Sequence, residues 1–391
     1  MRFIPDVGTI IPAIVVAFGS AALLALLLTP AVRRFARAFG LVDRPEARRV
    51  NERPIPRGGG LAVAAAFLSI AIAVVVVADR RIIGPIVIPG SVQPGELGAL
   101  LIGGLVAAAI GFLDDVLQIR ARWQLAGQVA VALGAAIAGV TVDSIANPLG
   151  PGQIRLEAFA GAFTVVWIVG MINSINFIDG LDGLSSGIAL IAAVTLGLIS
   201  VTTAVGPFGQ PFIAVLCFVL AGALLGFLRW NFHPATIFVG TSGVMFIGYT
   251  LAVLSILGSA KVAIALLVLG VPIIDTFWII VRRLANRRSP FTPDRGHVHH
   301  RLLDLGLSHT LTVVLIYVIT AGLATLTFLL SGAGQLYAFL GVVVGSGIVL
   351  FLLTGRQSVQ EDLEADSYDD APDRLQASGN PDLAGRPDRT G

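Results

Sequence analysis

Long apolar runs, separated by short polar segments, follow one another along most of the 391-residue chain. A membrane-spanning helix needs roughly 20 mostly apolar residues, and eleven runs come close to that length. The pattern therefore predicts an all-α, polytopic membrane protein with about 10 to 11 transmembrane helices. The runs lie at approximately 9–29, 58–78, 97–113, 123–142, 158–175, 184–204, 211–228, 243–259, 262–281, 310–330 and 337–354.

Composition supports this class and excludes others. Apolar residues make up 55% of the chain and charged residues only 13%, whereas a soluble domain has about a quarter charged residues. The first run is expected to remain as a span, because no small-residue cleavage site followed by polar sequence comes after it. The single cysteine, Cys217, excludes a disulfide framework and a cysteine-based metal site, and is expected to serve packing.

Basic residues are distributed unevenly between the two predicted sides of the membrane. If the N-terminus lies outside and all eleven runs cross, 18 of the 26 Lys and Arg residues fall in loops or span ends on one side, and five on the other. Short cytoplasmic loops carry the excess of Lys and Arg. We therefore expect the basic side, which also holds the polar motifs described below, to face the cytoplasm.

The stretch at residues 173–183 reads N-S-I-N-F-I-D-G-L-D-G and comes at the end of an apolar run. Asp179 and Asp182 thus follow just where a membrane-length helix ends, and carboxylates are tolerated at the rim of the hydrocarbon but costly inside it. Asn173 and Asn176 add amide donors and acceptors about one helical turn apart. These groups favour a polar, oxygen-rich ligand. The alternative is a turn between two spans, since Asn, Asp and Gly are common in turns.

Two adjacent acids, Asp114 and Asp115, end the third predicted helix. Adjacent carboxylates repel each other, so a half-buried pair usually needs a cation or a shared proton. A magnesium ion bound to phosphate groups would meet that need. Solvated acids that cap the loop are the alternative.

The segment between the first two spans, residues 29–60, carries eight arginines and ends in R-P-I-P-R-G-G-G. One interpretation is a solvated basic loop attracted to an anionic leaflet. The other is that Arg53 or Arg57 binds a phosphate, assisted by glycines 58–60, which would open the second helix with exposed N–H groups.

The seventh run ends in R-W-N-F-H-P-A-T-I-F-V-G-T-S-G. Arg229, Asn231 and His233 are candidates for polar contacts, and Phe238 is a candidate for stacking on a nucleobase. For this phenylalanine the alternative is an interfacial anchor or a core residue.

An acidic residue, Asp275, lies inside the ninth run, seven residues before Arg282. On a straight helix it would lie about 10 Å inside the boundary. An ionisable group at such a depth indicates a functional site. The alternatives are an ion pair with Arg282 or Arg283, or a bond to a neighbouring helix.

The loop that follows contains three of the five histidines, His297, His299 and His300, between Arg295 and Arg301. Neither a cysteine nor an H-E-x-x-H pattern accompanies them. The composition therefore favours a loop that binds a polyanion over a zinc site.

Beyond residue 355 the sequence becomes polar and acidic, with few residues to bury. We expect two parts, an integral membrane domain over residues 1–355 and a disordered acidic cytoplasmic tail over residues 356–391.

Six motifs occur in a fixed order: P-I-P-R-G-G-G-L, the Asp114 and Asp115 pair, N-x-x-N-F-x-D-G-L-D-G-L, N-x-H-P-A-x-x-F-x-G, the P-x-x-D at residues 272–275, and H-V-H-H-R-L. Together they resemble the polyprenyl-phosphate N-acetylhexosamine-1-phosphate transferases of glycosyltransferase family 4, which also contains phospho-N-acetylmuramoyl-pentapeptide transferase. The similarity covers about residues 30–355. The form H-x-H-H-R-L resembles the branch that uses UDP-N-acetylhexosamines.

This resemblance implies transfer of N-acetylhexosamine 1-phosphate from a UDP-sugar to polyprenyl (undecaprenyl) phosphate with release of UMP, the first step of a lipid-linked cell-envelope glycan. It also implies a multi-pass protein of the bacterial cytoplasmic (inner) membrane whose active site faces the cytoplasm. The expected cofactor is Mg²⁺, with Mn²⁺ as an alternative. The expected partners are UDP-N-acetylhexosamine, polyprenyl phosphate and a second copy of the chain in a homodimer, and no nucleic acid.

The resemblance also implies roles for individual residues. Asp114 would hold or deprotonate the lipid phosphate, Asp115 would assist with metal or substrate, and Phe238 would stack on uracil. Asn176, Asp179 and Asp182 would bind the nucleoside and the metal-diphosphate. The expected catalytic residues are Asp114, Asp115, Asp179, Asp182, His297, His299 and His300, the expected substrate-binding residues are Arg57, Asn173, Asn176, Phe238, Asp275, Arg295 and Arg301, and the expected metal ligands are Asp115, Asn176 and Asp179.

One position departs from the family pattern. The family usually reads F-M-G-D-x-G-S, with the Asp as a magnesium ligand, whereas this chain has Thr241 at that Asp and Val244 at that Ser. A neutral hydroxyl replaces neither the charge of a carboxylate nor its preference for a hard cation. Three explanations remain open: the metal is held by Asp114, Asp115 and Asp179, the enzyme is slow or altered, or activity has been lost. A transporter of an anionic lipid or a nucleotide-sugar is the alternative from another class, although transporters place their polar groups near the bilayer midplane.

Overall fold

The computed structural model divides the chain into two units, Met1–Leu340 and Gly341–Gly391. The predicted tail at residues 356–391 lies outside the residues that the structure describes, so its disorder stays a prediction. The described residues are 7–43, 54–82, 86–147, 150, 152–202, 210–258, 262–285, 297–330 and 333–347.

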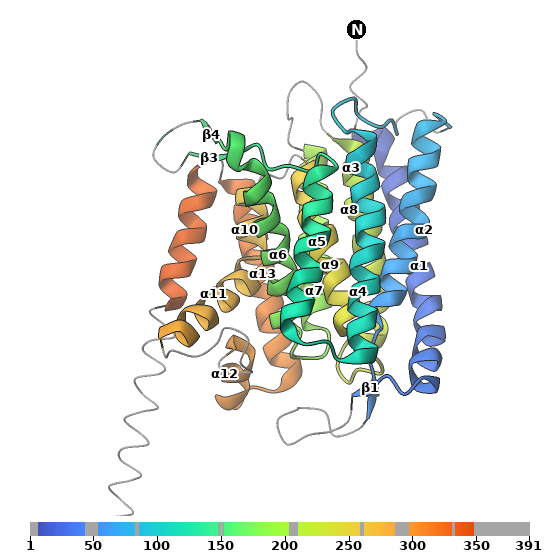
Figure 1. Ribbon diagram of the computed structural model, residues 1–391, viewed down its shortest axis with the longest axis vertical. Coiled ribbons are helices and arrows are strands. Elements are labelled where there is room, and N and C mark those ends of the chain that lie inside the picture. Colours follow the sequence, from blue (N-terminus) through green and yellow to red (C-terminus); the bar gives the residue numbers. More distant parts are fainter. Residues whose placement is uncertain are drawn as a thin grey trace, which may run out of the picture. The chain divides into compact units, whose positions relative to one another are not determined.

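Helices make up nearly all of the regular structure, as expected (Figure 1). They are α1 Val7–Ala38, α2 Gly60–Asp79, α3 Pro94–Gly98, the π-helix η1 Ala99–Gly103, α4 Gly104–Leu117, α5 Ala121–Ile137, the 3-10 helix η2 Glu157–Phe159, α6 Ala160–Ile178, α7 Leu184–Thr202, α8 Pro211–Asn231, α9 Gly240–Leu257, α10 Val262–Val268, α11 Gly270–Ala285, α12 Val298–Asp304 and α13 His309–Leu329. Two short antiparallel strand pairs join β1 Val42–Asp43 to β2 Ile55–Pro56 and β3 Ser144–Ala146 to β4 Gln153–Arg155.

The prediction of an all-α polytopic membrane protein is confirmed. Within the described residues, eight helices are long and apolar enough to cross a membrane, and α10 with α11 makes a ninth if this pair, bent by 82°, counts as one span. Two further predicted runs coincide with shorter apolar helices, the 17-residue α5 and Ala333–Gly347.

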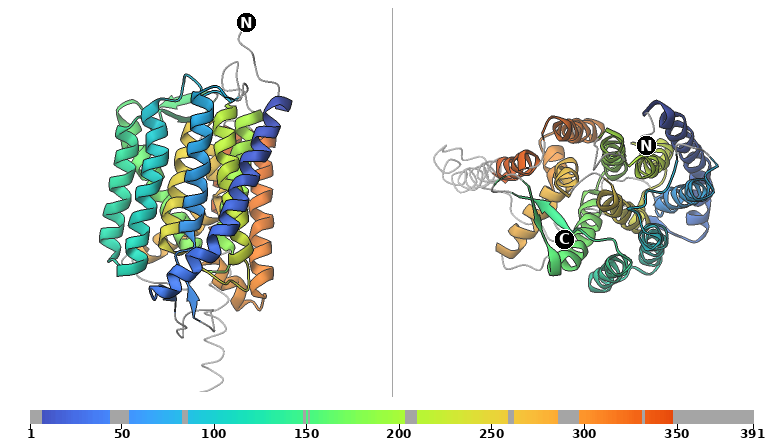
Figure 2. Two further views of the ribbon diagram at one scale, coloured as in Figure 1. Left: turned by 90° about the vertical axis from the view of Figure 1, so that its right-hand side faces the viewer. Right: turned by 90° about the horizontal axis from the view of Figure 1, so that it is seen from above.

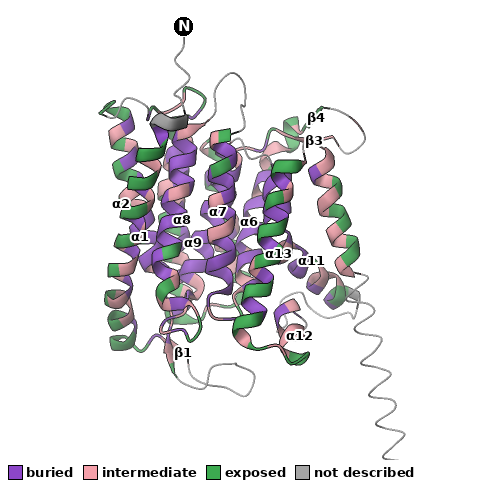
Figure 3. Ribbon diagram, turned by 180° about the vertical axis from the view of Figure 1, so that it is seen from behind, coloured by how far each residue is buried: buried purple, intermediate pink, exposed green. Residues whose placement is uncertain are grey.

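The helices differ in how much of their apolar surface is covered. In α8 and α9, 78% and 83% of the apolar stretch is buried, against 22% in α1. Figures 2 and 3 show α8 and α9 among other helices, while α1 and α2 lie on the outside and carry many exposed residues. A helix that is apolar all round and half exposed suits a hydrocarbon environment. The outer surface of this unit is therefore the one that lipid would cover.

Glycines bring the helices near the site into close contact. A Cβ atom on Gly60 would overlap the Cα of Gly243, and one on Gly226 would overlap the carbonyl oxygen of Ala22. The first pair joins the start of α2 to the start of α9, and the second joins α8 to α1. Small residues allow such approaches between membrane helices. They hold α1, α2, α8 and α9 in the arrangement that positions the site.

Candidate active site

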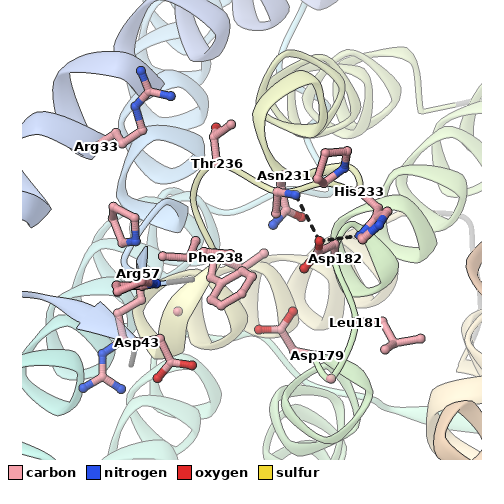
Figure 4. A pocket seen from close by; sticks show the side chains of 18 of the residues that line it. Arg33, Asp43, Arg57, Asp179, Leu181, Asp182, Asn231, His233, Thr236 and Phe238 are labelled. Carbon is pink, nitrogen blue, oxygen red and sulfur yellow. Dashed lines mark hydrogen bonds and ion pairs between the residues drawn. The ribbon is translucent and has the colours of Figure 1, made fainter. Parts of the chain in front are cut away.

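A cavity of about 1000 Å³ opens at the end of Met1–Leu340 where β1 and α12 lie (Figures 1 and 4). Residues from α1, α4, α6, α8, α9, α12 and α13 and from the segments between helices line it. The polar lining residues are Arg33, Arg37, Asp43, Arg57, Asp115, Asn176, Asp179, Asp182, Asn231, His233, Thr236, Thr241, His300 and His309.

The loop after α6 supplies two carboxylates, Asp179 and Asp182. The Asp179 carboxylate accepts a hydrogen bond from the Ser185 hydroxyl at 2.5 Å. Burial raises the pKa of Asp179 to about 7, the hydrogen bond from Ser185 opposes this rise, and the negative charges of Asp115 and Asp182 add to it. Because three acids crowd one another here, the arrangement favours a bound cation.

The Asp115 side chain ties α4 to the beginning of α9. Its carboxylate oxygens accept hydrogen bonds from the backbone N–H groups of Thr241 at 2.9 Å and Ser242 at 3.0 Å, and the residue is only 2% exposed. An acceptor at a helix N-terminus satisfies N–H groups that lack partners within the helix. Asp115 therefore fixes the position of Thr241 as well as contributing charge to the cavity, where Arg57 interacts with it electrostatically.

The segment between α8 and α9 pairs with the segment before α2. Phe238 N–H donates to Pro56 O, Gly59 N–H to Phe238 O and Gly60 N–H to Val239 O, each at 2.8 Å. These bonds place Phe238 on the cavity wall near Arg57 (Figure 4). The expectation that glycines 58–60 offer free N–H groups to a phosphate is wrong for Gly59 and Gly60, since carbonyl groups of the α8–α9 segment take them.

Asn231, at the end of α8, is held from two sides. Its side-chain oxygen accepts from the Ser186 hydroxyl at 2.7 Å, and its side-chain nitrogen donates to Ile237 O at 3.1 Å. These bonds fix the turn that carries His233 and Phe238 to the cavity.

A second polar group lies around Asp182. Its carboxylate oxygen Oδ2 is 2.8 Å from Nδ1 of His233 and accepts from Ala235 N–H at 3.0 Å. The backbone N–H of Asp182 donates to Nε2 of His309 at 3.2 Å, and the two imidazole rings stack with centroids 4.2 Å apart. This group, Asp182, His233 and His309, is called the cavity triad below.

Several predicted site residues are not among the described residues that line the cavity, and Asp114 and Asn173 are two of them. Asp114 accepts a hydrogen bond from Ile119 N–H at 2.9 Å, just past the end of its own helix. Asn173 donates to Gln128 at 2.6 Å and to Val169 O at 2.8 Å, which links α6 to α5. Their observed contacts are with the protein itself.

The histidine loop divides between two environments. His300 lines the cavity. His297 and His299 are buried, and Asp275 joins them, with Oδ2 2.8 Å from Nδ1 of His297 and Oδ1 accepting from Val298 N–H at 2.9 Å. Asp275, His297 and His299 are called the buried triad below.

The structure changes the interpretation of Asp275. Asp275 bonds His297 and the backbone N–H of Val298 at the start of α12, so the expected bond to a neighbouring element is present. The depth expected for a straight helix does not apply, because α10 and α11 are bent by 82°. Asp275 therefore anchors the histidine helix to α11.

His299 is 1% exposed, and neither of its ring nitrogens has a hydrogen-bond partner among the described residues. Burial lowers its pKa to about 2, and the nearby His300, His297 and His309 lower it further. The ring is therefore neutral at any physiological pH. A Cβ on Gly180 would overlap it, so the absence of a side chain at Gly180 makes room for the imidazole.

Two groups of acidic and histidine side chains have ligand atoms within 4.8 Å of one another and the composition of a metal site, namely the cavity triad and the buried triad. Arg301 is described but is not among the described lining residues, and Arg53 and Arg295 lie outside the described residues.

Several polar residues on the cavity wall were not among the predicted site residues, including Arg33, Arg37 and His309. Arg33 and Arg37 lie four residues apart at the C-terminal end of α1, and this spacing on one helix face was the available signal. The Arg33 guanidinium also lies 5.2 Å from the ring centroid of Trp230. His309 carried no signal, because a single histidine at a helix start is common.

Comparisons with known proteins identify the family of this chain. The sequence model of glycosyl transferase family 4 matches residues 97–259. The chain is 36% identical over 312 residues to a probable undecaprenyl-phosphate N-acetylglucosaminyl 1-phosphate transferase of Bacillus subtilis, an alignment that covers 78% of this chain and 82% of that protein. It is 34% identical over 360 residues to the decaprenyl-phosphate N-acetylglucosaminephosphotransferase of Mycolicibacterium smegmatis, covering 85% and 86%.

A more distant relative aligns over a similar share of the two chains. The undecaprenyl-phosphate alpha-N-acetylglucosaminyl 1-phosphate transferase of Thermotoga maritima is 27% identical over 325 residues, covering 83% of this chain and 91% of that protein. The chain thus belongs to the polyprenyl-phosphate N-acetylhexosamine-1-phosphate transferases, glycosyl transferase family 4.

Proposed function

We propose that this protein transfers N-acetylhexosamine 1-phosphate from a UDP-N-acetylhexosamine to a membrane-embedded polyprenyl phosphate and releases UMP. The observation that carries the proposal is the meeting of Asp115, Asp179 and Asp182 with Arg57 and Phe238 around one cavity at the end of the apolar helices (Figure 4). Phosphoryl transfer depends mainly on positioning and on neutralising charge, and this cavity offers groups for both.

The two substrates place different demands on the cavity. The acceptor carries a long apolar chain that stays in the hydrocarbon while its phosphate lies at the rim, and Arg33 and Arg37 at the end of α1 suit that phosphate. The donor carries a nucleobase, and Phe238 offers an aromatic face for stacking, with a positive Arg57 beside it. Asn176 adds an amide group that can bind the sugar or the nucleoside.

The carboxylates fit a divalent cation. Asp115, Asn176 and Asp179 line the same cavity and carry the oxygen ligands that Mg²⁺ prefers, and Mn²⁺ accepts the same set. Burial raises the pKa of Asp179, and the neighbouring charges of Asp115 and Asp182 add to the rise. When bound, the cation would neutralise the diphosphate and stabilise the charge that develops on the leaving UMP. Thr241 lines the cavity at the position of the usual Asp, so its hydroxyl would supply a neutral ligand or none.

The test is an assay of the purified protein with radiolabelled UDP-N-acetylglucosamine, polyprenyl phosphate and Mg²⁺. We expect label in a lipid-linked product together with equimolar UMP, and no product when EDTA replaces the metal. Label that stays in the UDP-sugar under every metal and donor condition would contradict the proposal. Entry of intact UDP-sugar into proteoliposomes would favour the transporter instead. A panel of UDP-N-acetylhexosamines in the same assay identifies the donor.

We further propose that the protein lies in the bacterial inner membrane with the cavity toward the cytoplasm, and that two copies form a homodimer. Cys217 is buried, so the chain offers an unreactive background for single-cysteine labelling. A membrane-impermeant thiol reagent should label the exposed Ser91→Cys in intact spheroplasts and the exposed Phe39→Cys only after permeabilisation. The reverse pattern would overturn the orientation. Mass photometry in detergent would test the dimer.

A further inference from the structure

We propose that His233, held by Asp182 and stacked on His309, binds the phosphate monoester of the acceptor and takes up its proton during transfer. This inference rests on the proposed function and gives His233 the proton-accepting role that the family resemblance assigned to Asp114.

The hydrogen bonds of the cavity triad determine which atoms of His233 are available. Asp182 Oδ2 accepts from Ala235 N–H at 3.0 Å and lies 2.8 Å from His233 Nδ1. A carboxylate only accepts, so Nδ1 carries the ring proton and Nε2 keeps its lone pair. The His233 side chain is 40% exposed and lines the cavity. Its orientation therefore leaves Nε2 as a hydrogen-bond acceptor for a ligand.

His309 supplies the complementary group. Its Nε2 accepts from the backbone N–H of Asp182 at 3.2 Å, so its Nδ1 carries the proton. That Nδ1 is buried and has no hydrogen-bond partner among the described residues. A buried donor without a partner is costly and indicates a missing ligand. His309 also begins α13, whose N-terminus favours an anion.

A monoprotonated phosphate monoester matches this pair of atoms. Its P–O–H group can donate to His233 Nε2, and one of its other oxygens can accept from His309 Nδ1–H. His233 Nδ1 and His309 Nε2 already take part in hydrogen bonds within the cavity triad, so these two nitrogens are not free to bind a cation. Of the two substrates only the acceptor carries a phosphate monoester with a second pKa near 6, since both phosphates of a UDP-sugar are diesters.

The proton transfer accounts for every atom. The phosphate O–H bond breaks and an N–H bond forms at His233 Nε2, which leaves a phosphate dianion. An oxygen of this dianion then forms a bond to the sugar-bearing phosphorus of the donor. The bond from that phosphorus to the UMP oxygen breaks, and UMP leaves with the electron pair. Asp182 stabilises the imidazolium, which returns its proton to solvent afterwards.

The other acids of the site are less suitable for this step. Asp114 is not among the described lining residues and accepts from Ile119 N–H. Both oxygens of Asp115 accept backbone N–H groups, and Asp179 accepts from Ser185. The crowded acids also disfavour a phosphate dianion in the cavity, so the acceptor should bind with its proton still attached. A group beside the bound phosphate must then take that proton before the phosphate can attack.

The charged and titratable groups around His233 belong to several elements. Asp182 comes from the loop after α6 and His309 from α13. Arg33 and Arg37 from α1, with Asp179, line the same cavity. Arginines keep their charge over the working pH range, so Arg33 and Arg37 do not cause a change of rate with pH. Variants of the cavity triad then show which of its residues causes such a change.

The experiment compares the native chain with His233→Gln over pH 5 to 9, at varied acceptor and fixed saturating donor. Gln keeps hydrogen-bonding groups near the position of Nε2 but cannot take a proton. We expect kcat/KM for the acceptor to fall by about tenfold near pH 5, where most of the free acceptor is the monoanion, and by much less near pH 9, where the free acceptor is already a dianion. The KM for the UDP-sugar should stay within a factor of about two, because His233 is proposed to contact the acceptor and not the donor.

Two further variants keep the test decisive if His233→Gln folds poorly, which thermal unfolding in detergent would show. His309→Gln should raise the KM for the acceptor with little change in the shape of the pH profile, and Asp182→Asn should reproduce the pH-dependent loss. A loss that is equal at every pH, or a raised KM for the donor, would overturn the inference. Native activity together with a fully active His233→Gln would also overturn it. An inactive native protein would instead refute the proposed function.

Discussion

The cavity triad and the buried triad have the same composition, one aspartate and two histidines, but different surroundings. In both, an Asp oxygen lies 2.8 Å from a histidine Nδ1. In the cavity the histidine is 40% exposed, whereas in the buried triad it is 11% exposed and its aspartate 3%. The cavity triad is therefore open to a ligand and can act on substrate, whereas the buried triad holds α12 in place.

The buried triad still affects the site, through position. Asp275 holds the first residues of α12, and α12 carries His300 to the cavity wall. The bent α10–α11 pair brings Asp275 to the place where this bond forms. Changes in the buried triad should therefore act through stability, and changes around the cavity through catalysis. The predictions below test this division.

The largest effect is expected at the cavity acids. Asp179→Asn removes a charge that a divalent cation would balance, so turnover should fall by about 10²–10³-fold or more while expression and thermal unfolding change little. Lipid-linked product formed per minute is the measurement. Asp143→Asn, an exposed acid far along the chain from the cavity motifs, is the matched control and should retain native activity. A near-native rate for Asp179→Asn would remove this residue from the mechanism.

The next effect is expected on stability at the buried triad. Asp275→Asn weakens two hydrogen bonds to a buried carboxylate and should lower the free energy of unfolding by about 2–3 kcal/mol. Thermal unfolding in detergent should show a lower Tm, with kcat at low temperature reduced less than by Asp179→Asn. Asp304→Asn, on the exposed side of the same α12, should change stability by less than about 0.5 kcal/mol. An unchanged Tm for Asp275→Asn would contradict the anchoring role.

A pH dependence of stability should follow from His299. Its pKa of about 2 in the folded state is below the usual value near 6.5, so the unfolded chain binds a proton that the folded chain does not. Stability should thus be complete above pH 6.5 and decline as pH falls below it, by about 1.4 kcal/mol per pH unit from this residue. Denaturant titrations at pH 7 and pH 5.5 would measure the decline. In His299→Gln the decline should be smaller by that amount, and an identical decline would show that other groups cause it.

The smallest effect is expected at Thr241, whose backbone is held by Asp115. Thr241→Asp restores a carboxylate at the cavity wall and should raise activity, or lower the Mg²⁺ concentration for half-maximal rate, by a few-fold if the metal is weakly held. Thr241→Asn, which is similar in size but neutral, is the control. An unchanged or lower rate in Thr241→Asp would indicate that the present ligands already suffice.

Local sequence reasoning could not choose between neighbouring residues on one helix. Asp114 and Asp115 are adjacent and therefore point about 100° apart on α4. Only the packing of α4 against α9 decides that Asp115 faces the cavity and Asp114 bonds its own loop. Asn173 and Asn176 present the same problem on α6, where α5 takes Asn173 and the cavity takes Asn176.

The sequence alone determined the membrane class, the approximate place of the apolar helices and the groups of residues that form the site, because hydrophobic length and residue type are local properties. Tertiary structure alone decided that His309 and Arg33 reach the cavity, that Asp275 turns to the histidine helix, and that Phe238 is held by Pro56 and Gly59. These contacts join positions far apart in the chain. They depend on helix crossing and on the bend between α10 and α11, which the order of residues does not show by itself.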